Sequence, residues 1–140
     1  MEKMEKRLFF LINRVQHQIF KHVDQRCEAE MSCSVSQVAA MFYVAKHRDC
    51  LVKELAQALG MNNPGVSGLV QRMERNDLVK KSPCSLDGRA SRLSLTALGQ
   101  EKLQLATPLI QEMNEVLTEG FSEQEIATVL KFLNRMLERF

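Results

Sequence analysis

Hydrogen-bonding and basic side chains are concentrated between residues 62 and 92. Residues 63–92 carry six basic and three acidic side chains, whereas residues 93–140 carry four basic and seven acidic ones. Amide and hydroxyl groups can hydrogen-bond to base edges, and arginine and lysine side chains can pair with phosphates. A basic segment set against an acidic C-terminal third therefore favours a polyanionic partner on one face of the molecule.

Helix and turn signals place these side chains on two helices followed by a hairpin. Residues 53–59 have helical periodicity and end at Gly60, and a few strand residues are expected just before them, between 49 and 52. Asn62 then provides an N-cap and Pro64 a first-turn proline for a helix that reaches about Asn76.

Two extended segments follow this helix pair, at residues 78–85 and 91–96. The residues between them, Leu-Asp-Gly-Arg at 86–89, contain the aspartate and glycine of a hairpin tip. A helix, a short turn, a second helix and a basic hairpin together predict a winged helix-turn-helix.

Long apolar helices are expected before this motif. Apolar residues recur at helical spacing from Lys3 to Arg26, and Ser34 and Gln37 form a capping box for a second helix that ends near His47. The first helix is long enough for part of its apolar face to lack a partner within the chain.

Two more helices are expected after the motif. Thr96 caps a long helix that Pro108 bends without ending its apolar stripe, and Ser122 with Glu125 forms a capping box for the last helix. The predicted fold class is therefore mainly α with a small β-hairpin wing.

Several stretches of the sequence resemble the MarR family of bacterial transcription regulators. They read S-V-S-Q-V, K-E-L-A-Q-A-L-G-M, V-S-G-L-V-Q-R-M-E, D-L-V and D-G-R-A-S-R-L-S-L-T-A-L-G. The resemblance covers essentially all of the chain in order, and its most specific part is D-x-R followed by L-T-x-x-G. It implies a homodimer with intertwined terminal helices and two winged domains that read a pseudo-palindromic operator in double-stranded DNA.

The chain, at 140 residues, is expected to form one unit. Residues 33–96 are the predicted winged helix-turn-helix, and residues 1–32 and 97–140 are the predicted dimerisation helices. The apolar faces at both ends support dimerisation, because exposing them would leave larger patches than soluble monomers normally carry.

The candidate DNA-binding residues fall into two groups. On the second helix of the motif, some side chains can hydrogen-bond to bases, two can contact a thymine methyl group, and two arginines face later turns that suit phosphates. On the hairpin, one arginine is placed for the minor groove, an aspartate orients an arginine, and further basic residues meet phosphates. The helix group is Asn62, Asn63, Ser67 and Gln71, with Pro64 and Val66, and with Arg72 and Arg75; the hairpin group is Arg89, Asp87, Lys80, Lys81 and Arg92.

Simpler explanations exist for several of these residues. The asparagines can serve as plain N-caps, the arginines of the helix can be solvated, and turn chemistry alone accounts for Asp87 and Gly88. The sequence also departs from the family pattern at Gly68, where a larger side chain is common, at Asp77, where a helix-ending glycine is common, and at Leu51, which leaves Asp49 as the nearby cap.

The resemblance further implies a small aromatic effector bound between the dimerisation helices and the winged domain. Candidate wall residues are Phe9, Phe10, His17, Phe42 and Tyr43. Aromatic residues at helical spacing also form ordinary cores, so core packing is the alternative.

The four cysteines contain no C-x-x-C pair and are expected to be buried free thiols. A thiol switch at Cys27 or Cys33 is an alternative signal, although no basic cluster adjoins them. Cysteine and histidine spacings match no common zinc pattern, so neither a metal nor a cofactor is expected.

These features predict a homodimeric, sequence-specific DNA-binding regulator, a repressor released by a small-molecule or oxidative signal. The alternative is a protein-binding winged helix without specific DNA binding. No phosphate-cradling glycine loop, acid/base pair or nucleophile elbow indicates an enzyme. The longest apolar run near the N-terminus, at residues 8–12, is too short for a membrane span, so a cytoplasmic protein is expected.

Overall fold

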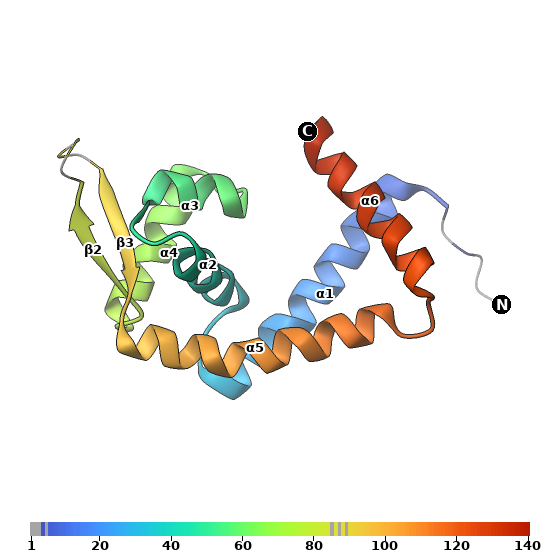
Figure 1. Cartoon of the computed structure of the whole chain (residues 1–140), viewed down its shortest axis with the longest axis horizontal. Coiled ribbons are helices and arrows are strands. Elements are labelled where there is room, and N and C mark those ends of the chain that lie inside the picture. Colours follow the sequence, from blue (N-terminus) through green and yellow to red (C-terminus); the bar gives the residue numbers. More distant parts are fainter. Residues whose placement is uncertain (1–3, 5, 85, 87, 89) are drawn as a thin grey trace. The chain divides into compact units, whose positions relative to one another are not determined.

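The computed structural model describes residues 4, 6–84, 86, 88 and 90–140, which form helices and one small sheet (Figure 1). The chain forms two compact units, Met1–Thr107 and Pro108–Phe140. The predicted mainly helical class with a hairpin wing is confirmed. The elements in chain order are α1 (Leu8–Met31), α2 (Val35–Lys46), β1 (Cys50–Leu51), α3 (Val52–Leu59), α4 (Asn63–Arg75), β2 (Val79–Pro83), β3 (Ser91–Leu95), α5 (Ala97–Thr118) and α6 (Glu123–Arg139).

Helix α1 begins at Leu8, later than the expected Lys3, and continues to Met31, beyond the expected Arg26. Its apolar face continues past Arg26 through the buried Cys27 and Met31, which pack in the region where α1 meets α2. The helix ends at Ser32, whose left-handed backbone (φ 56°) lets its N–H bond to the Glu28 carbonyl. Burial of the last turn thus sets the end of α1.

Capping interactions confirm the predicted starts of α2 and α6. The Ser34 hydroxyl accepts from the Gln37 N–H, and the Gln37 side chain accepts from the Ser34 N–H, each at 3.1 Å. Ser122 and Glu125 make the same reciprocal pair, at 3.0 and 3.1 Å. Each pair satisfies two donors that the helix backbone leaves unpaired.

The start of α3 differs from expectation. Leu51 is the N-cap residue, and its N–H donates to the Glu54 carboxylate at 2.9 Å. The prediction that Asp49 caps this helix is wrong. Asp49 instead adopts a left-handed turn (φ 57°), and its carbonyl accepts a 2.7 Å hydrogen bond from Arg92 Nη1.

The sheet has the order β1-β3-β2, with both pairings antiparallel. Strand β3 is central: Leu93 lies opposite Cys50 of β1 and Lys81 of β2. The strand expected between residues 49 and 52 is therefore confirmed as β1. Because β1 leads directly into α3, the sheet fixes the start of that helix next to the wing.

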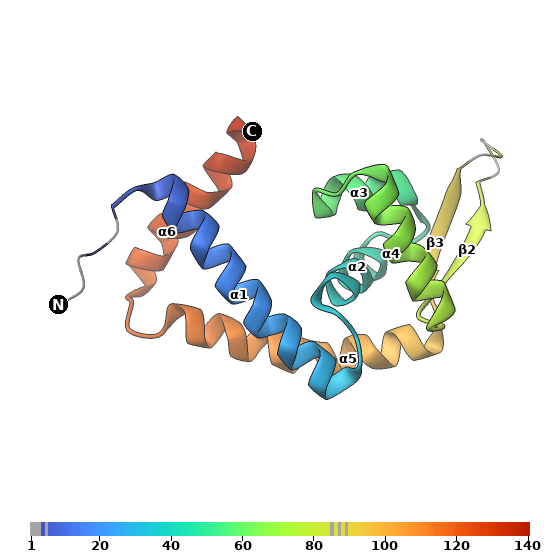
Figure 2. The ribbon, with the colours of Figure 1, turned by 180° about the vertical axis from the view of Figure 1, so that it is seen from behind.

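The core of the first unit lies among α2, α3, α4 and the sheet, which Figure 2 shows grouped together. Apolar side chains from all of these elements are fully buried there, and their burial supplies the main stabilisation of the unit. The largest are Met41, Leu55, Leu69, Met73, Leu78 and Leu93.

A set of hydrogen bonds joins the end of α4, the sheet and the start of α5. Asp77 has a left-handed backbone (φ 59°), which turns the chain into β2. The Leu78 carbonyl accepts from the Thr96 N–H at 3.1 Å, and the Thr96 hydroxyl donates to the Asp77 carbonyl at 2.5 Å. The same hydroxyl oxygen accepts from the Gly99 N–H at 2.9 Å, so Thr96 both caps α5 and ties it to the wing.

Helix α5 continues through Pro108, and the second unit contains its last part and α6. None of the 17 residues of α6 is buried. Its apolar side chains recur at i, i+3, i+4, i+7 and i+11 and form a stripe along one face. These are Ile126, Val129, Leu130, Leu133 and Leu137.

No helix in the described part of the chain combines the length and hydropathy needed to span a bilayer.

Candidate nucleic-acid interface

Helix α4 has one buried face and one polar, exposed face. Its buried face consists of Val66, Leu69, Val70 and Met73, which anchor it in the core. The opposite face exposes Asn63, Pro64, Ser67, Gln71 and Arg75. All of these except Pro64 follow the spacing i, i+4, i+8 and i+12 from Asn63, so these four side chains line one exposed edge of the helix, where they can contact a ligand.

The prediction that Val66 contacts a thymine methyl group is wrong. Its side chain is only 1% exposed, because residue 66 begins the apolar stripe that continues at Leu69, Val70 and Met73. Pro64, two residues earlier, is exposed, so its contact with a thymine methyl group stays a prediction.

Asn62 serves as the helix cap. Its side-chain oxygen accepts from the Gly65 N–H at 2.8 Å, so only its NH₂ group is left to donate to a ligand. Asn63, the first residue of α4, is exposed. The capping interpretation therefore holds for Asn62.

Arg72 lies over the backbone of Gly68. A Cβ atom at Gly68 would lie 3.3 Å from Arg72 Nη1. The glycine that departs from the family pattern thus leaves room for a guanidinium group directed back along the exposed helix surface. Both Arg72 and Arg75 are exposed, as phosphate contacts require.

The two lysines of β2 point to opposite faces of the strand. Lys81 Nζ lies 3.4 Å from Glu74 Oε1 on α4, so Lys81 faces the helix. Its neighbour Lys80 is exposed and, because side chains alternate along a strand, lies on the other face. Arg92 braces the turn at Asp49 through the hydrogen bond described above, a role not evident from the sequence. The predicted contacts of Asp87 and Arg89 lie outside the described residues.

A cleft of about 370 Å³ lies between the wing, the start of α3 and the exposed face of α4. Lys53 and Lys81 line it from different elements, together with polar groups of α4 and β3. The position of Lys53 is not evident from the sequence, because only the pairing of β1 with β3 brings the first turn of α3 next to the wing. The full lining is Leu51, Val52, Lys53, Asn63, Val66, Ser67, Lys81, Ala90 and Ser91.

The candidate effector-pocket residues come from two helices and differ in burial. Phe9 and His17 are exposed on α1, whereas Phe42 and Tyr43 are half-buried on α2. The Tyr43 ring stacks on His47 with centroids 4.3 Å apart, and burial, with a smaller contribution from Glu54, raises the pKa of Tyr43.

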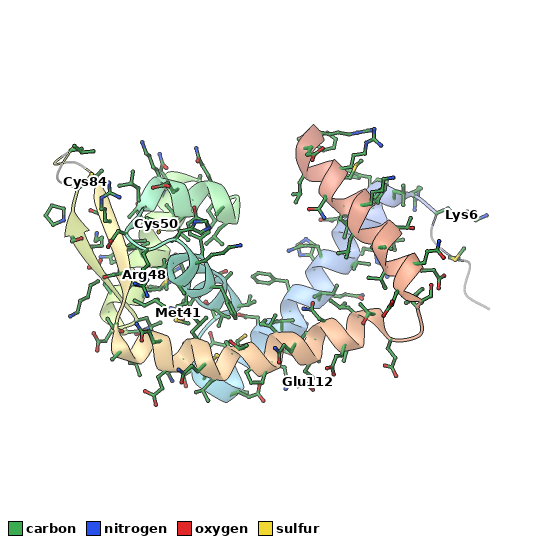
Figure 3. The ribbon with its side chains drawn as sticks, viewed as in Figure 1. Lys6, Met41, Arg48, Cys50, Cys84 and Glu112 are labelled. Carbon is green, nitrogen blue, oxygen red and sulfur yellow. The ribbon has the colours of Figure 1, made fainter. Side chains whose placement is uncertain are left out.

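A different cavity, of about 570 Å³, lies in the first unit between the end of α2, β3 and α5. Figure 3 labels Arg48, which lines it at the turn that follows α2. Its polar lining includes a cation, a carboxylate, a hydroxyl and two amides. The residues are Val44, Ala45, Arg48, Asp49, Ser94, Leu95, Gln100, Leu103 and Gln104.

All four cysteines are buried free thiols, as predicted. Burial is the main cause that raises the pKa of Cys27, Cys33 and Cys50, and Asp24 adds to the effect at Cys27. A raised pKa lowers the fraction of reactive thiolate. The environment of these thiols therefore does not favour a redox switch.

Comparisons with known proteins agree with this geometry. Residues 34–90 match the sequence model of the MarR family. The structure is similar to MepR of S. aureus in complex with DNA, with a TM-score of 0.89 at 24% identity, over 97% of this chain and 100% of that chain.

Two further structures share the fold over nearly the whole chain. The PcaV transcriptional regulator of Streptomyces coelicolor, in complex with its natural ligand, matches with a TM-score of 0.82 at 20% identity, over 99% of this chain and 98% of that chain. A MarR protein of Peptoclostridium difficile matches with a TM-score of 0.89 at 16% identity, over 99% of this chain and 90% of that chain. The winged segment is therefore similar in sequence to the MarR family, and the chain has the winged helix-turn-helix fold of these structures over nearly its whole length.

Proposed function

We propose that this chain is a homodimeric, sequence-specific DNA-binding repressor that a small molecule releases from its operator. The observation that carries the proposal is the polar, exposed face of α4 beside a cleft that two lysines line. A helix of this kind in a winged helix-turn-helix enters the major groove, and basic residues beside it neutralise phosphates. The DNA complex of the similar MepR supports this placement.

A second copy of the chain is the partner proposed for the terminal helices. Helix α6 exposes Val129, Leu130, Leu133 and Leu137, and α1 exposes a further apolar set. Soluble monomers rarely leave such continuous apolar faces in water. A twofold dimer then presents two copies of α4 about one DNA turn apart, roughly 34 to 36 Å, which matches a pseudo-palindromic operator.

Base reading is assigned to Asn63, Ser67 and Gln71, and phosphate contacts to Arg72 and Arg75. The amides and the hydroxyl lie along the exposed edge of α4, where base edges come within reach. The arginines lie nearer the C-terminal end of the helix, where positioning on the backbone is the expected role. A DNA partner also implies a cytoplasmic location. The proposed function includes no catalytic step.

Binding of selected genomic duplexes, followed by fluorescence anisotropy over a range of KCl concentrations, tests this function. Gln71→Ala should alter the preferred bases and weaken the operator complex by about 1 to 3 kcal/mol. Gln57→Ala, on the exposed side of α3, is the matched control and should keep the base preference. Wild-type affinity that is independent of salt, or equal for unrelated duplexes, would contradict the proposal.

The release signal is assigned to a small molecule because a cavity of ligand size is present while the thiols are unfavourable for oxidation. The cavity of about 570 Å³ falls within the usual range for small-molecule sites, roughly 300 to 1,000 Å³. Aromatic acids and phenols should therefore dissociate the operator complex in a concentration-dependent way. Release by peroxide that Cys27→Ser or Cys33→Ser abolishes would instead favour the thiol switch.

A further inference from the structure

We propose that the cleft between the wing, α3 and α4 binds a phosphodiester group of the DNA backbone, held by Lys53 and Lys81. This inference rests on the proposed function and adds a defined contact to it. Of the two contacts, the one made by Lys53 is new, because neither the sequence pattern nor the exposed face of α4 indicates it.

The cleft brings together the donors that a phosphate group needs. Lys53 comes from the first turn of α3 and Lys81 from β2, so two lysines line the same space from different elements. Ser91 adds a hydroxyl. Phosphate oxygens accept hydrogen bonds from all of these groups, and the charged donors make the strongest ones.

The charge of the cleft is positive among the described residues. None of its described lining residues is acidic, and the ion pairs found in the described part of the chain do not include Lys53. Lys81 pairs with Glu74 at 3.4 Å, which holds its ammonium group toward α4. Because an ammonium group has three donors, Lys81 can keep this ion pair and still bind a phosphate oxygen.

The position of the cleft identifies its occupant as part of a duplex. Asn63 and Ser67 line the cleft and also belong to the exposed face of α4 that is proposed to enter the major groove. A duplex placed on that face carries its phosphates along the groove edges, next to the helix and the wing. A backbone phosphate therefore reaches the cleft without any separate ligand.

The test is the salt dependence of operator affinity for charge-removing variants. The logarithm of the binding constant should fall less steeply with the logarithm of KCl concentration in Lys53→Gln and in Lys81→Gln, by about 0.9 for each phosphate contact that is lost. Affinity should fall to a similar extent for operator and unrelated duplexes, because backbone contacts carry no sequence information. Lys53→Arg should restore most of the slope.

Lys46→Gln is the charge-matched control. Lys46 is exposed at the end of α2 and does not line the cleft, so this variant should keep the wild-type slope. Urea unfolding of each variant checks that the substitutions leave the free energy of unfolding unchanged.

Three results would overturn the inference, and they are separable from failure of the proposed function. Wild-type slope and affinity in both Lys53→Gln and Lys81→Gln would remove the cleft contact while leaving DNA binding intact. The inference would also fail if inorganic phosphate raised the free energy of unfolding of the wild type only, while Lys53→Gln and Lys81→Gln bound DNA normally. The cleft would then bind free anions and not the DNA backbone. No salt-dependent DNA binding by the wild type would remove both proposals.

Discussion

Gly99→Ala should destabilise the chain and disturb the wing, because α5 approaches the backbone of Leu78 too closely for a side chain. A Cβ atom at Gly99 would lie 2.2 Å from the Leu78 carbonyl oxygen. This is more than 1 Å inside an ordinary van der Waals separation of about 3.5 Å. The obstacle is backbone, which cannot rotate away as a flexible side chain can.

The magnitude follows from the contacts at this junction. Overpacking costs about 1 to 3 kcal/mol, and a shift of Leu78 also weakens the Thr96 N–H to Leu78 carbonyl bond, worth about 1 kcal/mol. Alanine returns up to about 1 kcal/mol through its better helix propensity. The free energy of unfolding should therefore fall by about 1 to 3 kcal/mol.

Thermal unfolding at a fixed protein concentration measures this effect. A loss of about 1 to 3 kcal/mol corresponds to a drop in Tm of roughly 3 to 12 °C for a chain of this size. Gly88→Ala is the control, because a Cβ atom at Gly88 has no neighbour within 4 Å among the described residues, and the Tm of this variant should stay within about 2 °C of wild type. An equally small change for Gly99→Ala would refute the close-approach argument.

Further predictions concern backbone strain, thiols and a helix cap. Asp77→Gly should raise the free energy of unfolding by about 0.5 to 1 kcal/mol, because it relieves a left-handed aspartate (φ 59°) and keeps the carbonyl that Thr96 uses; a loss of stability in urea would contradict this. The four buried thiols should react with a disulfide reagent at pH 8 far more slowly in the native protein than in urea, and equal rates would contradict the burial argument. Hydrogen bonds from the Ser122 N–H and hydroxyl hold the pKa of Glu125 below its ordinary value. The stabilisation from Glu125 is therefore present above the unfolded-state pKa and is lost as pH falls through the lower folded-state pKa. Glu125→Gln should reduce the acid dependence of unfolding in that window, and an unchanged pH profile would count against the cap.

Local signals predicted most element boundaries because each depends on a few adjacent residues. Ser34, Asn62 and Ser122 mark helix starts through hydrogen bonds within three residues, and Gly60 ends α3 with a left-handed backbone (φ 65°). The end of α1 was mispredicted because burial of Met31 against other elements, a tertiary effect, extends the helix beyond Arg26.

The candidate site was only partly predictable for the same reason. The exposed edge of α4 follows from helical periodicity, although Val66 was assigned to the wrong face of that helix. Lys53 and the Arg92 hydrogen bond to Asp49 depend on which strands pair, and no local pattern reveals that pairing. Only the structure explains why the L-T-x-x-G motif has a glycine at residue 99: the backbone of Gly99 lies too close to Leu78 for a side chain.

The central claim is that two copies of α4 read one duplex together. Sequencing the genomic fragments that the purified protein retains, with the mass of each complex measured in parallel, tests it most directly. The fragments should contain an inverted repeat whose half-site centres lie about 10 to 10.5 base pairs apart, and one dimer should bind each repeat. Enriched fragments without any symmetry, or a single chain bound per site, would contradict it.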